Sequence, residues 1–285
     1  MTFDTIQTIP VSPALGAEIG GVDLSQSLGD DVIAEIRQAW LEYRVVFFRD
    51  QDITPEQHLA FARRFGDLVT YPMVKGLDDY PEIAPVIKLE HQTVNFGGIW
   101  HSDTTYLPQP PMGAILVARE LPPKGGDTLF ANMQAAYEHL DDQTKARLEG
   151  LTVIHSHDYI ISLSSELSRR QDQGEYTELP PVSHPLARVH PETGQRSLFL
   201  SPHTMVAIEQ LPDPEGRALL DRLIEHATQN RFVYRHRWRE HDVIMWDNRC
   251  TMHMVTPFDN QAQRRIMHRT TIVGDDAPIP ARSVT

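Results

Sequence analysis

Residues 242–274, "DVIMWDNRCTMHMVTPFDNQAQRRIMHRTTIVG", carry the pattern that decides the fold. An apolar run leads into a tight polar turn, His253 follows, and an arginine-rich segment then closes on a β-branched run. Short apolar or alternating runs bounded by turn residues are typical of β-strands. The stretch therefore predicts two strands, with His253 between them.

The same character extends over most of the chain after about residue 67. Further runs of this kind, separated by Pro, Gly and Asp, lie at 84–91, 112–120, 127–131, 196–201 and 232–238. Apolar residues at spacings of three and four predict helices within 132–150 and 213–229. The polar stretch 162–181 is predicted to be a mobile loop, and long loops in compact domains are often lids over sites. The fold class is therefore mainly β with peripheral helices.

Two more helices are predicted before residue 67. In residues 30–44, apolar side chains recur at helical spacing behind a cap at Asp30 or Asp31. Residues 53–66 hold a cap, a proline in the first turn, a capping-box glutamine and a terminal glycine: Thr54, Pro55, Gln57 and Gly66.

Composition limits the classes of protein that the chain can form. The formal net charge of −13 disfavours nucleic acid as a partner. No segment approaches the roughly 20 apolar residues that span a bilayer, and the first residues show no secretory signal. Cys250 is the only cysteine, which excludes an intrachain disulfide and fits a reducing cytoplasm. We expect a single cytoplasmic domain over residues 1–285, with no membrane partner.

A candidate metal site begins in "GGIWHSDTTYLP", residues 97–108. If this run is a strand, His101 and Asp103 point to the same face and can meet at one metal ion. Alone, an H-x-D pair is usually solvated, and a lone histidine such as His253 is usually packed in a core. Two histidines and a carboxylate from distant strands, however, form the facial triad of non-haem Fe(II) oxygenases, which leaves one face of the metal open.

Longer stretches carry a resemblance to a known family. They are "WHSDTTYLPQPPMGAILVARELPPKGGDTLFANMQAAYEHL" at 100–140 and "WDNRCTMHMVTPFDNQAQRRIMHRTTI" at 246–272, with "ALGAEIGGVDLS", "FARRFGDL" and "HATQNRFVYRHRWREHDVIMWDNRC" as flanks. Nearly the whole chain resembles the taurine dioxygenase and 2,4-dichlorophenoxyacetate dioxygenase (TauD/TfdA) family of Fe(II)/2-oxoglutarate enzymes. The last flank is closer to the aryloxyalkanoate branch. The resemblance implies a double-stranded β-helix, or jelly roll, with helices packed outside.

The resemblance also implies roles for particular residues. His101, Asp103 and His253 would be the iron ligands. Thr128 would hydrogen-bond the distal carboxylate of 2-oxoglutarate, and Arg265 would pair with it, because a guanidinium grips a carboxylate with two parallel bonds. The same motif contains two more arginines. Arg269 would hold an anionic group of the substrate or co-substrate, and Arg264 would be a surface charge.

The family's reaction consumes 2-oxoglutarate and O2, releases succinate and CO2, and hydroxylates the substrate. Related halogenases lack the carboxylate ligand, so Asp103 favours hydroxylation. Where the hydroxylated carbon bears a heteroatom, the product collapses with cleavage of the carbon–heteroatom bond. The resemblance further implies a homodimer or homotetramer.

The substrate is predicted to be a small organic anion other than taurine. The taurine branch has a histidine and an asparagine where this chain has Tyr71 and Gly97, which should widen the pocket. An aryloxyalkanoate, alkylsulfonate or alkyl sulfate fits better. Candidates for lining the pocket, beside Tyr71, Gly97 and Arg269, are Tyr106, His203, His155, His157 and Tyr159.

Two other functions stay open at this point. One is a jelly-roll protein that binds a metal or an organic acid without turnover. The other is a Zn-dependent hydrolase, since zinc also accepts histidine and carboxylate ligands. A hydrolase has no use for the carboxylate clamp of Thr128 and Arg265, so metal identity and dependence on 2-oxoglutarate separate these functions.

Overall fold

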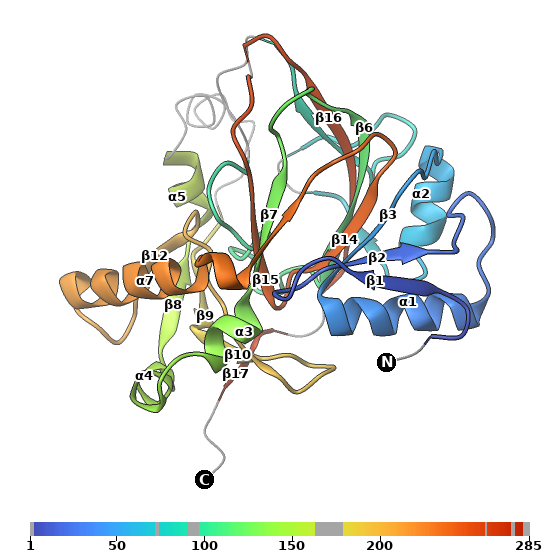
Figure 1. The fold of residues 1–285 in the computed structure, drawn as a ribbon. Helices are drawn as coiled ribbons and strands as arrows, with labels where there is room; N and C mark the ends of the chain where they lie inside the picture. The colour runs from blue at the N-terminus through green and yellow to red at the C-terminus, as the bar shows by residue number, and fades with distance from the viewer. Residues whose placement is uncertain are drawn as a thin grey trace.

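The computed structural model describes residues 3–71, 74–90, 97–162, 179–259, 261–274 and 277–281. The loop predicted at 162–181 falls mostly on residues 163–178, which lie outside the described residues. Within the described ranges the chain is mainly β with helices at the periphery, as the sequence predicts (Figure 1).

The largest sheet has eight strands in the order β1-β2-β3-β14-β6-β16-β4, with β5 also paired to β16. Most neighbours are antiparallel, and β2 and β3 are parallel. The strands are β1 (Gln7–Pro10), β2 (Ala17–Gly20), β3 (Val45–Phe48), β4 (Leu68–Val69), β5 (Ala84–Lys88), β6 (Gly113–Glu120), β14 (Val243–Asp247) and β16 (Arg265–Ile272).

Three smaller sheets complete the β structure of the described residues. The first, β13-β7-β15, consists of β13 (Val233–His236), β7 (Thr128–Asn132) and β15 (Thr251–Val255). The others consist of β12 (Met205–Ile208), β8 (Thr152–His155) and β9 (Val182–Pro185), and of β11 (Arg196–Leu198), β10 (Ala187–Val189) and β17 (Ile279–Pro280). The runs at both ends of 242–274 are thus strands, and His253 lies on a third strand between them.

The predicted helices are present, with different ends. They are α1 (Asp30–Tyr43), α2 (Pro55–Ala62), α3 (Met133–Glu138), α4 (Asp142–Leu148) and α7 (Asp213–Ala227), so the segment 132–150 forms two helices. A short helix α5 (His157–Ser162) and a 3-10 turn η1 (Asn230–Phe232) were not predicted.

The capping predictions were correct for α2 and wrong for α1. The Thr54–Gln57 capping box is formed, but α2 ends at Ala62 and a turn follows before Gly66. The N-cap of α1 is Gly29, which makes no side-chain cap. Asp30 and Asp31 instead occupy the first turn, where carboxylates stabilise the helix by interacting with its dipole.

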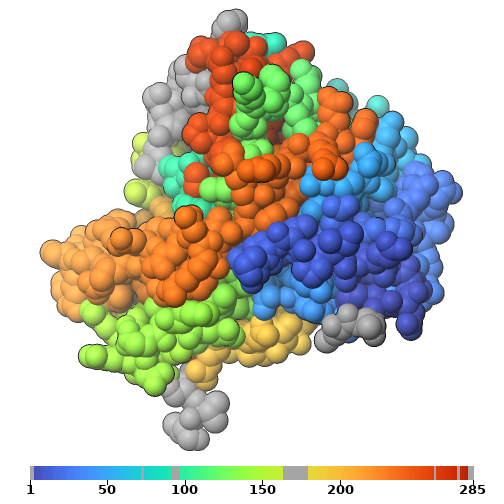
Figure 2. Space-filling view, viewed as in Figure 1, coloured from blue at the N-terminus to red at the C-terminus, as the bar shows by residue number. Residues whose placement is uncertain are grey.

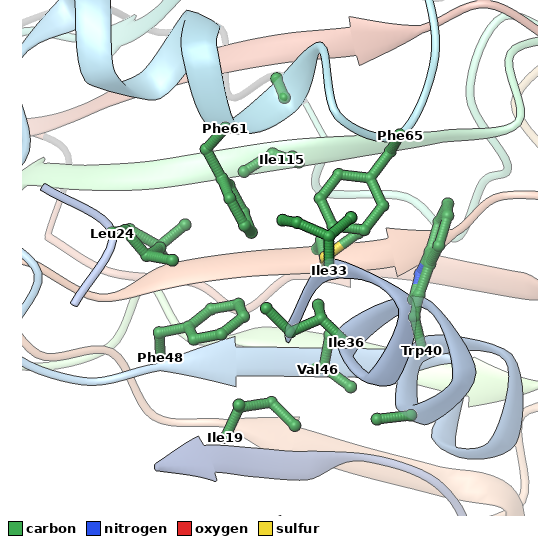
Figure 3. Close-up of a cluster of buried hydrophobic side chains, with 14 of the residues drawn as sticks. Ile19, Leu24, Ile33, Ile36, Trp40, Val46, Phe48, Phe61, Phe65 and Ile115 are labelled. Atoms are coloured by element: carbon green, nitrogen blue, oxygen red, sulfur yellow. The ribbon is translucent and has the colours of Figure 1, made fainter. Parts of the chain in front are cut away.

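Alternation along the large sheet separates a helix-covered face from a face that looks toward β13-β7-β15. Val46, Phe48 and Ile115 of the sheet pack under α1 and α2, in one cluster with Ile36 and Trp40 of α1 (Figure 3). Side chains on the opposite face of β3, β6 and β14 pack instead with Phe130 and Tyr234 of the smaller sheet; they include Phe47, Leu116, Ile244 and Trp246. Because side chains alternate along a strand, one sheet serves both the core and the site.

Segments from the N-terminal and C-terminal parts of the chain pair in this sheet. Strand β3 pairs with β14 along Val45–Phe48 and Val243–Trp246. Figure 2 shows the N-terminal segment, in blue, directly against later segments in orange.

In the parts of the chain that the structure describes, none of the helices has the length and apolar character needed to cross a membrane.

A close approach at Gly113 gives a stability prediction. A Cβ atom there would lie 2.5 Å from the carbonyl oxygen of Trp246 and 2.5 Å from the Trp40 ring. Gly113→Ala should therefore lower the free energy of unfolding by about 1–3 kcal/mol through overpacking, measured by urea denaturation. Gly20→Ala is the matched control, since its nearest contact is an ordinary 3.5 Å. Equal effects of the two substitutions would contradict the packing argument.

Candidate active site

Three buried side chains converge between the large sheet and β13-β7-β15. His253 lies on β15, and His101 forms an isolated antiparallel bridge with it. The Nε2 atoms of His101 and His253 lie 3.9 and 3.8 Å from Oδ1 of Asp103. The three ligand atoms all lie within 4.8 Å of one another. The structure therefore brings together the histidines and the carboxylate that the sequence predicted as one group.

The prediction that His101 and Asp103 converge because they lie on one strand was partly wrong. Only His101 has a β-bridge, and the residues from Asp103 to Tyr106 form turns. Thr104 has a φ of +43°, a left-handed conformation that β-branched residues rarely adopt. A turn, held by its surroundings, aims Asp103 at the histidines.

Burial sets the protonation states that a cation site requires. It lowers the pKa of His101 to about 3 and that of His253 to about 4. Burial acts to raise the pKa of Asp103, but Arg269 and the two histidines outweigh it and hold that pKa well below its usual range. At neutral pH the site therefore offers two neutral imidazoles and a carboxylate.

The tautomer of His101 also fits metal binding. Its Nδ1 lies 2.7 Å from the carbonyl oxygen of Ile99, which can only accept a hydrogen bond. Nδ1 therefore carries the proton, and Nε2 presents its lone pair toward Asp103. Together with the charge of Asp103, this donor set suits a divalent cation such as Fe(II).

Two residues that sequence reasoning missed hold Asp103 in place. The Asn248 side chain accepts from the backbone N–H of Asp103 at 2.7 Å and donates to its carbonyl at 3.2 Å. The Trp246 indole donates to Oδ2 of Asp103 at 3.2 Å. Trp246 lies on β14 and Asn248 in the turn that follows it, and the only signal in the sequence was the polar "DN" step at the end of an apolar run.

The triad opens onto a cavity of about 320 Å³. Several predicted residues line it: Tyr71, Gly97, Tyr106, Thr128, His203, Arg265 and Arg269. Others had no prediction, including Val74, Lys75, Lys88, Leu116, Phe130, Ile160, Trp246 and Val255. The cavity thus combines an apolar wall with several cationic groups.

Three of the candidate pocket residues lie elsewhere. His155 is fully buried and bonds to the Thr204 hydroxyl at 2.8 Å. His157 packs its ring 5.0 Å from that of Tyr106, and neither it nor Tyr159 lines the cavity. Their short "HSHDY" motif leads from β8 into α5, and of the three only His157 contacts a residue of the wall, Tyr106.

Arg265, on β16, is a buried cation within the cavity wall. Its Nε donates to the Gly126 carbonyl at 3.1 Å, and it forms no ion pair with an acidic side chain of the described residues. Burial lowers its pKa to about 10. A buried guanidinium without a carboxylate is costly, so this position calls for an anionic ligand.

Thr128, on β7, lines the same cavity and has a free hydrogen to donate. Its Oγ1 accepts from the Trp238 indole at 3.0 Å. Since the indole nitrogen can only donate, the threonine proton remains available to a further acceptor. Arg265 and Thr128 therefore present hydrogen-bond donors to the same cavity from two different sheets.

Arg269 differs from Arg265 because it already has an anionic partner. One of its terminal nitrogens lies 2.9 Å from Oδ1 of Asp103, and its guanidinium lies between the rings of Tyr71 and Trp246, at 4.7 and 5.4 Å. Arg264 is the surface charge that was predicted, near Glu90 and Glu120.

A second group with metal-ligand chemistry, His190, Asp247 and Cys250, is structural. Both carboxylate oxygens of Asp247 are taken by Arg249, at 2.9 and 2.7 Å, and His190 adds a third contact at 2.9 Å. Burial raises the pKa of the Cys250 thiol, which disfavours the thiolate that binds metals.

Comparison with known proteins agrees with this site. The model of the family described as "Taurine catabolism dioxygenase TauD, TfdA family" matches residues 7–271. An (S)-phenoxypropionate/alpha-ketoglutarate-dioxygenase of Sphingobium herbicidovorans is 38% identical over 94% of this chain and 95% of that protein. The alpha-ketoglutarate-dependent 2,4-dichlorophenoxyacetate dioxygenase of Cupriavidus pinatubonensis is 35% identical over 95% of this chain and 98% of that protein.

Solved structures show the same fold. A taurine dioxygenase from Burkholderia xenovorans has a TM-score of 0.82 and 37% identity, covering 97% of this chain and 93% of that one. AAD-2, solved in complex with Mn(II) and N-oxalylglycine, has a TM-score of 0.81 and 38% identity, covering 97% and 100%. The chain belongs to the taurine catabolism dioxygenase TauD, TfdA family.

Proposed function

We propose that the protein is an Fe(II)- and 2-oxoglutarate-dependent dioxygenase that hydroxylates a small organic anion. The observation that carries the proposal is the pairing of two groups in one cavity. A buried His-Asp-His triad lines this cavity, and so does the buried guanidinium of Arg265, which forms no ion pair with any acidic side chain that the structure describes.

His101, Asp103 and His253 would hold the iron through Nε2, Oδ1 and Nε2. Iron bound there supplies the redox chemistry that activates O2 and oxidises an unreactive C–H bond. The chain contributes neutral imidazoles that stay deprotonated at physiological pH and a carboxylate kept ionised by Arg269. His101, Asp103 and His253 all line the cavity, so a metal held by them would be accessible to small molecules there.

Arg265 and Thr128 would bind the distal carboxylate of 2-oxoglutarate. The guanidinium supplies a planar pair of N–H donors, and the threonine hydroxyl supplies another. AAD-2 supports this assignment, since N-oxalylglycine carries a carboxylate at each end. Burial of the clamp excludes water and strengthens the charged hydrogen bonds.

The substrate class we propose is an aryloxyalkanoate, an alkyl sulfate or an alkylsulfonate. The relatives named above act on phenoxypropionate and 2,4-dichlorophenoxyacetate, and an alkylsulfatase of Acinetobacter baylyi is 32% identical over 95% of this chain. Apolar side chains such as Leu116, Phe130 and Ile160 give the cavity room for an aryl or alkyl body. Tyr71, Gly97, Tyr106 and Arg269 would contact this substrate, and hydroxylation beside its heteroatom would cleave the molecule.

Gly97 gives a prediction about substrate size. It has a φ of +85°, and a Cβ atom there would contact the His101 ring and Val255, each at 3.5 Å. Gly97→Ala should raise KM several-fold for a bulky aryloxyalkanoate relative to a short alkyl sulfate, with an unfolding cost of about 1 kcal/mol. Gly150→Ala is the control, because it has a φ of +72° and no neighbour within 4 Å. A proportional loss on both substrates would argue against a size effect.

Succinate release tests the proposed function. Purified protein with Fe(II), ascorbate, 2-oxoglutarate and O2 should form succinate only when one class of substrate is present. Hydrolysis supported by Zn(II) without 2-oxoglutarate would indicate the hydrolase. Tight binding of 2-oxoglutarate with no succinate from any substrate would favour the non-catalytic binding protein.

Further features belong to the same proposal. We propose a single domain over residues 1–285 with a jelly-roll core, supported by the family match over 7–271 and by the facing sheets. The cytoplasm suits its one cysteine, which is buried. A homodimer or homotetramer is expected from the family resemblance, and light scattering of the purified protein measures it.

A further inference from the structure

Two tryptophans each donate an indole hydrogen bond to one functional oxygen. Trp246, on β14, donates to Oδ2 of Asp103 at 3.2 Å. Trp238, in the connection between β13 and β14, donates to Oγ1 of Thr128 at 3.0 Å. Each indole nitrogen has one hydrogen and no acceptor capacity, so each bond has a fixed direction.

The bond from Trp246 helps to fix the orientation of the Asp103 carboxylate. Oδ1 faces the Nε2 atoms of His101 and His253 at 3.9 and 3.8 Å and accepts a hydrogen bond from Arg269 at 2.9 Å, whereas Oδ2 accepts from the indole. Trp246 is buried, with 2% of its surface exposed, so water does not compete for this contact. With Arg269 bonded to Oδ1 and Trp246 bonded to Oδ2, the carboxylate is held in one orientation, with Oδ1 directed toward the two histidines.

The bond from Trp238 directs the Thr128 hydroxyl. With its oxygen already accepting, the hydroxyl can turn its hydrogen toward an anion in the cavity that Thr128 lines. The Trp238 ring also lies 5.7 Å from the Arg265 guanidinium, and the ring of His236 packs against it with the two ring centroids 4.6 Å apart. Trp238 therefore touches both members of the carboxylate clamp.

We infer that Trp246 and Trp238 are positioning residues with separate tasks: Trp246 presents Asp103 to the metal, and Trp238 presents Thr128 to the distal carboxylate of the co-substrate. The inference rests on the proposed function and deepens it. If the tasks are separate, loss of one indole N–H weakens one ligand and spares the other.

The test crosses two variants with two ligands under anaerobic conditions. Trp246→Phe and Trp238→Phe keep an aromatic ring and remove the N–H. Calorimetry measures the Kd for Co(II) alone and then the Kd for 2-oxoglutarate at saturating Co(II). Trp246→Phe should weaken Co(II) binding about tenfold, as loss of a ligand's outer partner commonly does, and should alter the visible Co(II) spectrum. Trp238→Phe should leave Co(II) binding within about twofold and weaken 2-oxoglutarate about tenfold.

Two controls separate positioning from packing. Pyruvate lacks the distal carboxylate, so Trp238→Phe should not weaken its binding to the Co(II) protein. In a Thr128→Val background, Trp238→Phe should have no further effect on 2-oxoglutarate, because the two residues act as one unit. If Trp246→Phe does not fold, benzothienylalanine at position 246 preserves the indole shape without the N–H.

The outcomes are distinguishable. Wild-type protein that binds neither Co(II) nor 2-oxoglutarate overturns the proposed function. Wild-type protein that binds both, with variants that lose both ligands equally or lose neither, overturns the positioning roles alone. The crossed pattern, with pyruvate unaffected, supports them.

Discussion

His101→Ala should abolish succinate formation, with a fall of about a thousandfold or more. Removing one of three ligands forfeits metal-dependent stabilisation of several kcal/mol, and each 1.4 kcal/mol is about tenfold in rate. The fold should survive, because within the described residues the His101 side chain forms one hydrogen bond, to the Ile99 carbonyl. Succinate release and Co(II) calorimetry measure the loss, and circular dichroism checks the fold.

His203→Ala is the matched control for this result. Its ring lies 4.9 Å from that of His101 in the same cavity, but it is not part of the triad. It should bind Co(II) within a few-fold of the wild type and change mainly the KM for the organic substrate. Unchanged turnover in His101→Ala, or equal metal loss in both variants, would refute the ligand assignment.

Arg265→Met should raise the KM for 2-oxoglutarate by about 30- to 100-fold, because charge-assisted bonds to a carboxylate contribute about 2–3 kcal/mol. It should leave Co(II) binding unchanged. Arg265→Lys should fall between the two, since it keeps the charge and loses the paired donors. Initial rates at varied 2-oxoglutarate give these values, and Arg264→Ala on the surface is the control.

Although Arg265→Met should weaken 2-oxoglutarate binding, it should not lower the stability of the co-substrate-free protein. Burial depresses the pKa of Arg265 below its usual range, so folding disfavours its charged form at neutral pH. Without co-substrate, Arg265→Met should match or exceed the wild type in thermal stability. Added 2-oxoglutarate should raise the Tm of the metal-loaded wild type more than that of the variant. A large loss of stability in the co-substrate-free variant would mean that Arg265 is held by partners within the protein.

The sequence by itself determined the class of fold and the members of the triad. Alternating runs such as 112–120 and 242–248 are strands because one face packs under helices and the other faces the second sheet. His101, Asp103 and His253 were predicted from their ligand types and spacing together with the resemblance to the family. The resemblance, and not periodicity, pointed to Thr128 and Arg265.

Only the tertiary structure decided how those residues are aimed. Asp103 points at the histidines through a turn with a left-handed Thr104, and its carboxylate is oriented by Trp246, which lies 143 positions away in the chain. Trp238 is likewise 110 positions from Thr128. Hydrogen bonds depend on distance and direction between side chains from different strands, and local periodicity encodes only which face of its own element a residue occupies. For that reason the candidate ligands could be predicted from the sequence, whereas the side chains that orient them became apparent only in the tertiary structure.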